Sequence, residues 1–260
     1  MPLKYNNDNL LDVNGDPVMM PWEGQIMSAH ADLMSGNVLN VGFGIGLIDG
    51  LLQKRKPSKH YIIEAHPDVH AHIKKTGWPQ KPGVEILFGR WQDAISRVPT
   101  GSLDAVFYDT HDEGVEDFLH FALEAKRVLK PSGFLSFWNA YNAHNIFLHA
   151  VHCKAVTASL STMGFETRWR KMPVAIPEET WKAWGGVKNW YLNAYHLPVC
   201  TFPFAPGDGN QPPVLALGFE EGGEGLEVGG CVVLAEDMDN MMRSGIEECA
   251  NRALADAPAA

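Results

Sequence analysis

The chain has 260 residues, of which 45% are hydrophobic, and a formal net charge of −10. This length suits one well-buried domain with an appendage. The charge is uneven, because residues 201–260 hold eleven acidic and two basic residues. We therefore expect no nucleic-acid partner, since no basic surface is evident. With no run of about 20 apolar residues and no signal peptide, we also expect no membrane association and a cytoplasmic or nuclear location.

The first 35 residues predict a lid or substrate-binding segment. Asn14 and Gly15 form a hairpin-type turn signal between two short apolar patches. Residues 26–33 then have the spacing of a helix that leads into the first core strand. We therefore expect a small hairpin or an ordered lid in front of the main domain.

A glycine-rich turn follows the first apolar strand, residues 38–41. Gly42, Gly44 and Gly46 alternate with apolar residues, and an acid, Glu64, ends the next apolar run 22 residues after Gly42. An acid about 20 residues after such a turn is typical of a residue that binds a cofactor ribose. Because the pattern is G-x-G-x-G and not G-x-G-x-x-G, it favours S-adenosylmethionine over a nicotinamide dinucleotide.

The next segments predict a doubly wound, mostly parallel α/β sheet. Apolar strands alternate with helix-length segments, including an amphipathic helix over 116–129, stopped by residues 130–133, and a second helix over 143–163. Ligands in such sheets lie at the carboxyl ends of the strands, where Asp109 follows one strand. The predicted strands are 61–64, 84–87, 103–108 and 134–138.

Two late segments, 166–174 and 188–198, are rich in aromatic and β-branched residues and predict an antiparallel pair that closes a seven-stranded sheet near Cys200. The main domain would then span residues 36–200. Residues 201–260 are rich in Gly, Pro and acids, and we expect this acidic tail to be partly disordered.

The cysteines and histidines predict no metal site. The four cysteines lack C-x-x-C spacing. His66 and His70 share one helix face and His72 lies nearby, but no third ligand of suitable type accompanies them. We therefore interpret this group as a solvated helix surface.

Five sequence blocks follow one another along the chain. They are Pro17-Val18-Met19-Met20-Pro21-Trp22-Glu23, Leu39-Asn40-Val41-Gly42-Phe43-Gly44, Ile62-Ile63-Glu64-Ala65-His66, Gly89-Arg90-Trp91-Gln92-Asp93 and Tyr108-Asp109-Thr110. Taken together, these blocks resemble the fungal protein arginine delta-N-methyltransferase family and its relative, guanidinoacetate N-methyltransferase. The resemblance covers about residues 3–200, although the ankyrin-like N-terminal region of the protein-arginine family is not part of this sequence. It implies a class I S-adenosylmethionine-dependent methyltransferase fold, which is Rossmann-like.

The resemblance also implies which residues hold the cofactor. The turn from Gly42 to Leu47 would surround its methionine part, Glu64 would bind the ribose, and Trp91 with Gln92 would contact the adenine. A carboxylate suits two vicinal hydroxyl donors, and an amide can both donate to and accept from an adenine edge. The predicted cofactor-binding residues are Tyr5, Met19, Met27, Gly42, Phe43, Gly44, Ile45, Gly46, Leu47, Glu64, Ala65, His66, Trp91, Gln92 and Asp109.

Asp109 and Glu23 are the predicted catalytic residues. A guanidinium is a poor nucleophile until its charge is localised and a proton is lost, and carboxylates serve both needs. Either acid could instead cap the helix that follows it. Asp112, Glu113, Glu116 and Asp117 form an acidic edge that would either steer a basic peptide or simply be solvated.

The sequence therefore predicts an S-adenosylmethionine-dependent N-methyltransferase that acts on the delta nitrogen of a protein arginine. Methylation of a small guanidino compound is the alternative within this class. A catalytically inactive protein of the same fold, which binds partners through its acidic tail, is the alternative outside it.

Overall fold

The computed structural model describes residues 2–6, 9–111, 113–182, 186, 188–203, 225–228 and 231–234. The predicted acidic tail, 201–260, lies largely outside these residues, and its predicted disorder remains an expectation. Within them, a short antiparallel pair is present, β11 (Gly225–Val228) and β12 (Cys231–Leu234).

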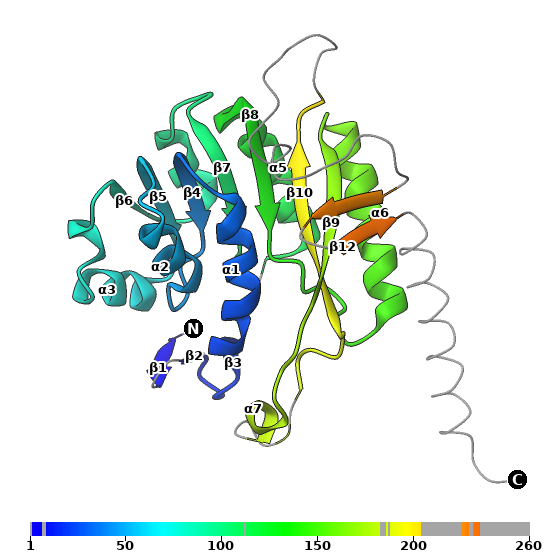
Figure 1. Ribbon diagram of the computed structural model, residues 1–260. Helices are drawn as coiled ribbons and strands as arrows, with labels where there is room; N and C mark the ends of the chain where they lie inside the picture. The colour runs from blue at the N-terminus through cyan, green and yellow to red at the C-terminus, as the bar shows by residue number, and fades with distance from the viewer. Residues whose placement is uncertain are drawn as a thin grey trace, which may run out of the picture.

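A seven-stranded sheet forms the centre of the molecule, as predicted (Figure 1). The strand order is β6-β5-β4-β7-β8-β10-β9, and β10 runs antiparallel to both of its neighbours. The five strands from β6 to β8 are mutually parallel. The strands are β4 (Asn37–Val41), β5 (Lys59–Glu64), β6 (Val84–Phe88), β7 (Leu103–Tyr108), β8 (Leu129–Phe137), β9 (Glu166–Pro173) and β10 (Ala194–Thr201).

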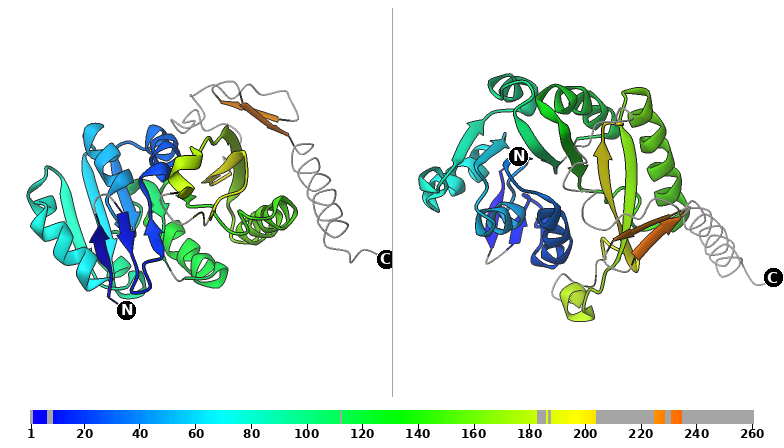
Figure 2. Two further views of the ribbon diagram at one scale, coloured as in Figure 1. Left: turned by 90° about the horizontal axis from the view of Figure 1, so that it is seen from below. Right: turned by 45° about the horizontal axis from the view of Figure 1, so that its top comes forward.

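Helices cover both faces of this sheet (Figure 2). One apolar core joins the sheet to α1 (Gly24–Leu33), α2 (Leu47–Lys54) and α3 (Pro67–Lys75). The other core joins it to α4 (Trp91–Ala94), α5 (Val115–Val128) and α6 (Ile146–Thr162). Three 3-10 turns span Pro21–Glu23, Trp78–Gln80 and Ile95–Arg97.

A small antiparallel sheet precedes α1 and lies where the parallel strands end (Figure 1). It consists of β1 (Lys4–Asn6), β2 (Asn9–Leu11) and β3 (Pro17–Met19). The Asp12 carboxylate accepts the amides of Asn14 and Asp16, both at 2.8 Å, and Gly15 has a φ of +86°. The predicted hairpin is thus confirmed, and the segment is placed over the end of the sheet where ligands bind.

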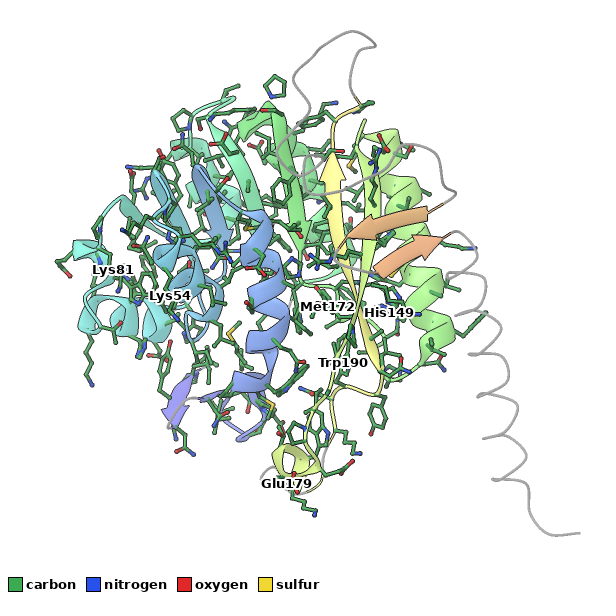
Figure 3. The ribbon with its side chains drawn as sticks, in the orientation of Figure 1. Lys54, Lys81, His149, Met172, Glu179 and Trp190 are labelled. Carbon is green, nitrogen blue, oxygen red and sulfur yellow. The ribbon has the colours of Figure 1, made fainter. Side chains whose placement is uncertain are left out.

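Two predicted boundaries were wrong. Residues 130–133 were expected to form a turn but belong to β8, because the register with β7 shifts there, and Gly133 fits only without a Cβ, which would lie 2.8 Å from the Leu103 oxygen. The last strand begins at Ala194 and not at 188. Trp190, one of the aromatic residues that suggested a strand, lies instead in a loop near α7 (Glu178–Lys182) (Figure 3). Its ring packs against those of Trp22 and Trp138.

Candidate active site

A cavity of about 900 Å³ opens at the carboxyl ends of the parallel strands, beneath the N-terminal segment. Its walls come from β3, from the turns after β4, β5 and β6, and from the loop after β7. The cavity therefore joins sequence blocks that are far apart along the chain. The predicted site residues that line it are Met19, Glu23, Gly42, Gly44, Glu64, Ala65, His66, Trp91 and Asp109.

The glycine turn is shaped by its contact with the loop after β7. Gly42 has a φ of +92°, and a Cβ there would lie 1.9 Å from the Asp109 carbonyl oxygen. The Asp109 amide in turn donates to the Val41 carbonyl at 2.9 Å. Because both backbones are fixed against each other, glycine at position 42 places Asp109 beside the turn.

Glu64 is almost buried at the end of β5 and faces this turn. Its carboxylate accepts the amide of Phe43 at 2.9 Å and the amide of His66 at 2.6 Å. Burial raises the pKa of Glu64, while these amide hydrogen bonds act in the opposite direction. Each carboxylate oxygen can accept more than one hydrogen bond, so Glu64 can still receive ligand hydroxyls.

Three buried polar side chains and the partly buried Gln53 form a network that contacts the turn. The Asn40 amide donates to the Gly42 carbonyl at 2.8 Å and to the Asp49 carboxylate at 2.9 Å. The other Asp49 oxygen lies 2.9 Å from Nε2 of His60, whose Nδ1 lies 2.9 Å from the Gln53 amide. Asn40, Asp49 and His60 are all 0% exposed, so these three side chains are shielded from solvent.

Asp109, in the loop after β7, and Glu23, in the 3-10 turn before α1, line the same cavity. Burial, with a smaller effect of the Asp49 charge, raises the pKa of Asp109 from 3.8 to about 7. Burial and the Asp109 charge raise the pKa of Glu23 from 4.5 to about 8, despite a 2.8 Å hydrogen bond from the Met20 amide. Carboxyl groups whose pKa values lie close to neutral pH can bind a cation when ionised or take up a proton.

The capping alternative does not explain Asp109. The next helix, α5, begins at Val115, and its N-cap is Gly114. Glu23 does bond the backbone of Met20 at the start of its own helical turn, so it has a local structural role as well as a place in the cavity wall.

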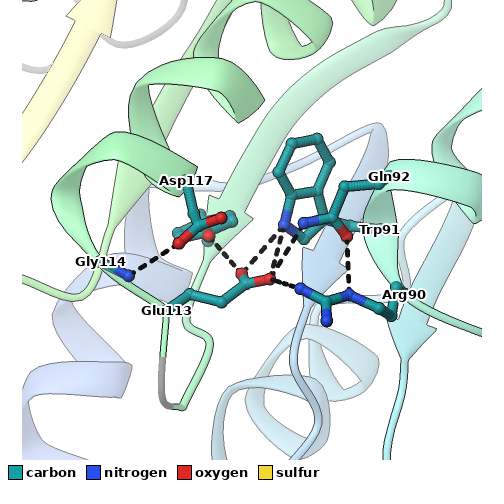
Figure 4. A network of polar contacts seen from close by, with 7 residues as sticks. Arg90, Trp91, Gln92, Glu113, Gly114 and Asp117 are labelled. Atoms are coloured by element: carbon teal, nitrogen blue, oxygen red, sulfur yellow. Dashed lines mark hydrogen bonds and ion pairs between the residues drawn. The ribbon is translucent and has the colours of Figure 1, made fainter.

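Glu113 bonds to both residues that the sequence predicted to contact the adenine (Figure 4). Its carboxylate accepts Trp91 Nε1 at 2.9 Å, the Tyr108 hydroxyl at 2.5 Å and the Gln92 amide at 3.2 Å, and it lies 3.4 Å from Arg90. Glu113 therefore connects the turn after β6 to the loop after β7. The sequence placed it on an exposed acidic edge, and nothing in the pattern of acids distinguished this inward-facing one.

Other predicted residues lie around the cavity without lining it. The Tyr5 hydroxyl donates to the Gly44 carbonyl at 2.8 Å, and Met27 is fully buried in the core. Phe43 is buried against Trp78, and Gln92 is exposed. Ile45, Gly46 and Leu47 continue the turn into α2, where Gly46 is the N-cap with a φ of +77°. The sequence did not assign Trp138, Thr110 or His111, which line the cavity after β8 and β7.

The three histidines at 66, 70 and 72 have separate local roles. His66 caps α3 by accepting the Asp68 amide at 3.2 Å. His70 stacks on Phe88, and His72 stacks on Tyr5 with ring centroids 3.8 Å apart. In the part of the chain that the structure describes, no group of three His, Cys, Asp or Glu residues could hold a metal ion, and no helix is long and apolar enough to cross a bilayer.

Comparison with solved structures supports the fold. Spermidine synthase from Thermotoga maritima aligns with a TM-score of 0.57 at 13% identity, over 94% of this chain and 87% of that one. A chain from the Haloferax volcanii complex of the Trm112 methyltransferase activator with a putative methyltransferase gives a TM-score of 0.52 at 16% identity, over 71% of this chain and 90% of that one. The seven-stranded sheet is thus that of class I methyltransferases.

Curated relatives are considerably closer in sequence. Proteins named protein arginine N-methyltransferase 2 match 77% of this chain at 38% identity in Yarrowia lipolytica, 40% in Aspergillus oryzae and 36% in Saccharomyces cerevisiae. The matches cover 46%, 50% and 51% of those proteins, so the chain spans about half the length of the curated relatives.

A family model described as guanidinoacetate N-methyltransferase matches residues 3–163. This match extends from β1 through α6 and contains every described residue that lines the large cavity except Pro2. The chain therefore belongs to the guanidinoacetate N-methyltransferase family, and its sequence relatives include the fungal protein arginine N-methyltransferases.

Proposed function

We propose that this protein is an S-adenosylmethionine-dependent N-methyltransferase that acts on a guanidino group, and that its acceptor is the delta nitrogen of a protein arginine. The names of the curated relatives support arginine as the acceptor. The observation that carries the proposal is the cavity that Glu64, Glu23 and Asp109 line together. It combines a site for a ribose with two carboxyl groups suited to a cation.

The residues present fit the cofactor. A cavity of about 900 Å³ is large enough for a nucleoside-sized ligand together with a side chain of the acceptor. Glu64 would bind the ribose hydroxyls, the turn beginning at Gly42 would hold the methionine part, and Trp91 would contact the adenine. Gln92 is tied to Glu113 and would have to turn inward to reach the adenine edge.

The chemistry requires alignment, charge complementarity and a proton acceptor. S-adenosylmethionine supplies an electrophilic methyl group on a sulfonium sulfur, and transfer breaks the S–C bond as the N–C bond forms. Asp109 and Glu23 would orient the planar guanidinium through charge-assisted hydrogen bonds. One of these carboxylates would take the proton that the guanidinium loses, so charge and atoms balance in the products, which are S-adenosylhomocysteine, a protonated carboxyl group and a methylated guanidinium.

A free guanidino compound is the second candidate acceptor, because the family model that matches the chain carries the name of a small-molecule enzyme. Incubation with methyl-labelled S-adenosylmethionine, followed by mass spectrometry of peptides and of free guanidino acids, separates the two candidates. We expect a label on peptidyl arginine, with fragments that place the methyl group on the delta nitrogen. A label on neither class would refute the enzyme, and calorimetry with S-adenosylhomocysteine would then show whether the protein is an inactive member of the fold.

A further inference from the structure

A second hollow, of about 240 Å³, adjoins the large cavity at Asp109. Its walls come from the ends of β7 and β8 and from the facing sides of α5 and α6, and they include Phe118 and Val156. The two spaces share Asp109, Thr110, His111, Glu113 and Trp138. The two spaces therefore lie side by side along these residues.

The walls of the hollow are suited to an uncharged, largely apolar group. No Lys or Arg is among its described lining residues, whereas Asp109 and Glu113 are. His152 also lines it, and the buried Nε2 of His152 has no hydrogen-bond partner among the described residues. Burial lowers the pKa of His152 to about 4, so this ring is neutral at neutral pH. A carboxylate would find no counter-charge here, so the hollow suits an uncharged group.

We propose that this hollow binds the apolar side chain of the residue next to the target arginine. The inference rests on the proposed function, since it assumes that Asp109 holds the guanidinium. A free guanidino acid carries a carboxylate and no neighbouring side chain, so it would leave the hollow empty. The hollow thus favours peptides in which arginine is flanked by apolar residues.

Three peptides of equal length test the proposal, each with one arginine flanked on both sides by Leu, Gly or Asp. Initial rates with labelled S-adenosylmethionine give kcat/KM for each. Burying a leucine side chain predicts about a tenfold higher kcat/KM for the Leu peptide than for the Gly peptide, and a still lower value for the Asp peptide. Equal values for the Leu and Gly peptides would overturn the proposal.

A filled hollow should remove this preference. Val156 is 1% exposed and lines the hollow, and Val156→Phe should bring the Leu-to-Gly ratio within about twofold, because the added ring occupies the space that the leucine needs. Val151→Phe is the matched control, since Val151 lies on the exposed side of the same helix at 41% exposure and should keep the wild-type ratio. Binding of S-adenosylhomocysteine shows whether each variant is folded, and if Val156→Phe does not fold, the peptide comparison on the wild-type protein still decides.

Failure of the inference is distinguishable from failure of the proposed function. Methylation of all three peptides at one rate refutes only the role of the hollow. Methylation of a free guanidino acid with no activity on any peptide refutes peptidyl arginine as the acceptor, and the role of the hollow with it. A Leu-to-Gly ratio of kcat/KM that stays at the wild-type value in Val156→Phe would overturn the proposal, because the flanking residue would then bind outside the hollow.

Discussion

Replacing Asp109 by Asn should reduce methyl transfer and, at the same time, stabilise the ligand-free protein at alkaline pH. The reason is that burial raises the pKa of Asp109 from 3.8 to about 7, so the folded protein resists the ionisation that the unfolded chain undergoes freely. A group of this kind contributes stability that is fully present below pH 3.8 and is lost as the pH rises to about 7.

The shift corresponds to at most about 4 kcal/mol of destabilisation above pH 7, at about 1.4 kcal/mol per pKa unit. Because a buried Asn side chain has its own desolvation cost of about 1–3 kcal/mol at every pH, we expect a net gain of about 1–3 kcal/mol in the free energy of unfolding at pH 8. The gain should shrink between pH 7 and pH 4 and become a net loss of about 1–3 kcal/mol below pH 4, where Asp109 is protonated in the folded and the unfolded protein and only the cost of the Asn remains. Activity should fall by about 10²–10⁴-fold, the usual contribution of a general base.

Urea unfolding of the ligand-free protein at pH 4, 6 and 8 measures the first effect, and initial rates with labelled S-adenosylmethionine measure the second. Asp16→Asn is the matched control, since Asp16 is exposed in the β2–β3 turn, and the same chemical change there should alter neither quantity with pH. A pH-independent stability change in Asp109→Asn, or near wild-type activity, would refute the reasoning.

Glu64→Gln should weaken binding of S-adenosylhomocysteine about 10–100-fold by calorimetry, because a charged acceptor of the ribose hydroxyls is lost, and unchanged affinity would exclude this role. Gly42→Ala should lower the free energy of unfolding in urea by more than about 2 kcal/mol, since the new Cβ would meet the Asp109 carbonyl, whereas Gly50→Ala, with open space around it, should not destabilise. Asp49→Asn removes a charge that raises the pKa of Asp109, so the acidic limb of the pH–rate profile should move to lower pH, and a limb that stays in place would show that Asp49 acts only on structure.

The type of sheet and the strand ends that carry the site were predictable because they depend on local patterns. The alternation of apolar strands with helical segments, together with the glycine turn after Val41, was enough to put Glu64 and Asp109 at one edge. Such signals depend only on spacing along the chain. A continuous apolar run predicts a strand of this kind because both faces of a parallel sheet are buried.

The remaining features depend on tertiary contacts that no local pattern encodes. Glu113 resembles its acidic neighbours in sequence, and only the approach of Trp91 from another strand end makes it the centre of a network. Lys130–Gly133 have the composition of a turn, yet they form an irregular part of β8, between its pairs with β7 at Leu129 and Phe134. The hollow beside Asp109 is lined by residues of both α5 and α6, and the separate helical periodicities of these segments give no sign of it.

The most direct test is a crystal structure of the protein with S-adenosylhomocysteine and an arginine peptide. The account predicts that the carboxylate of Glu64 lies within hydrogen-bond distance of both ribose hydroxyls, and that Asp109 contacts the guanidinium. A complex in which the nucleoside lies away from Glu64, or in which the guanidinium is held without Asp109, would contradict it.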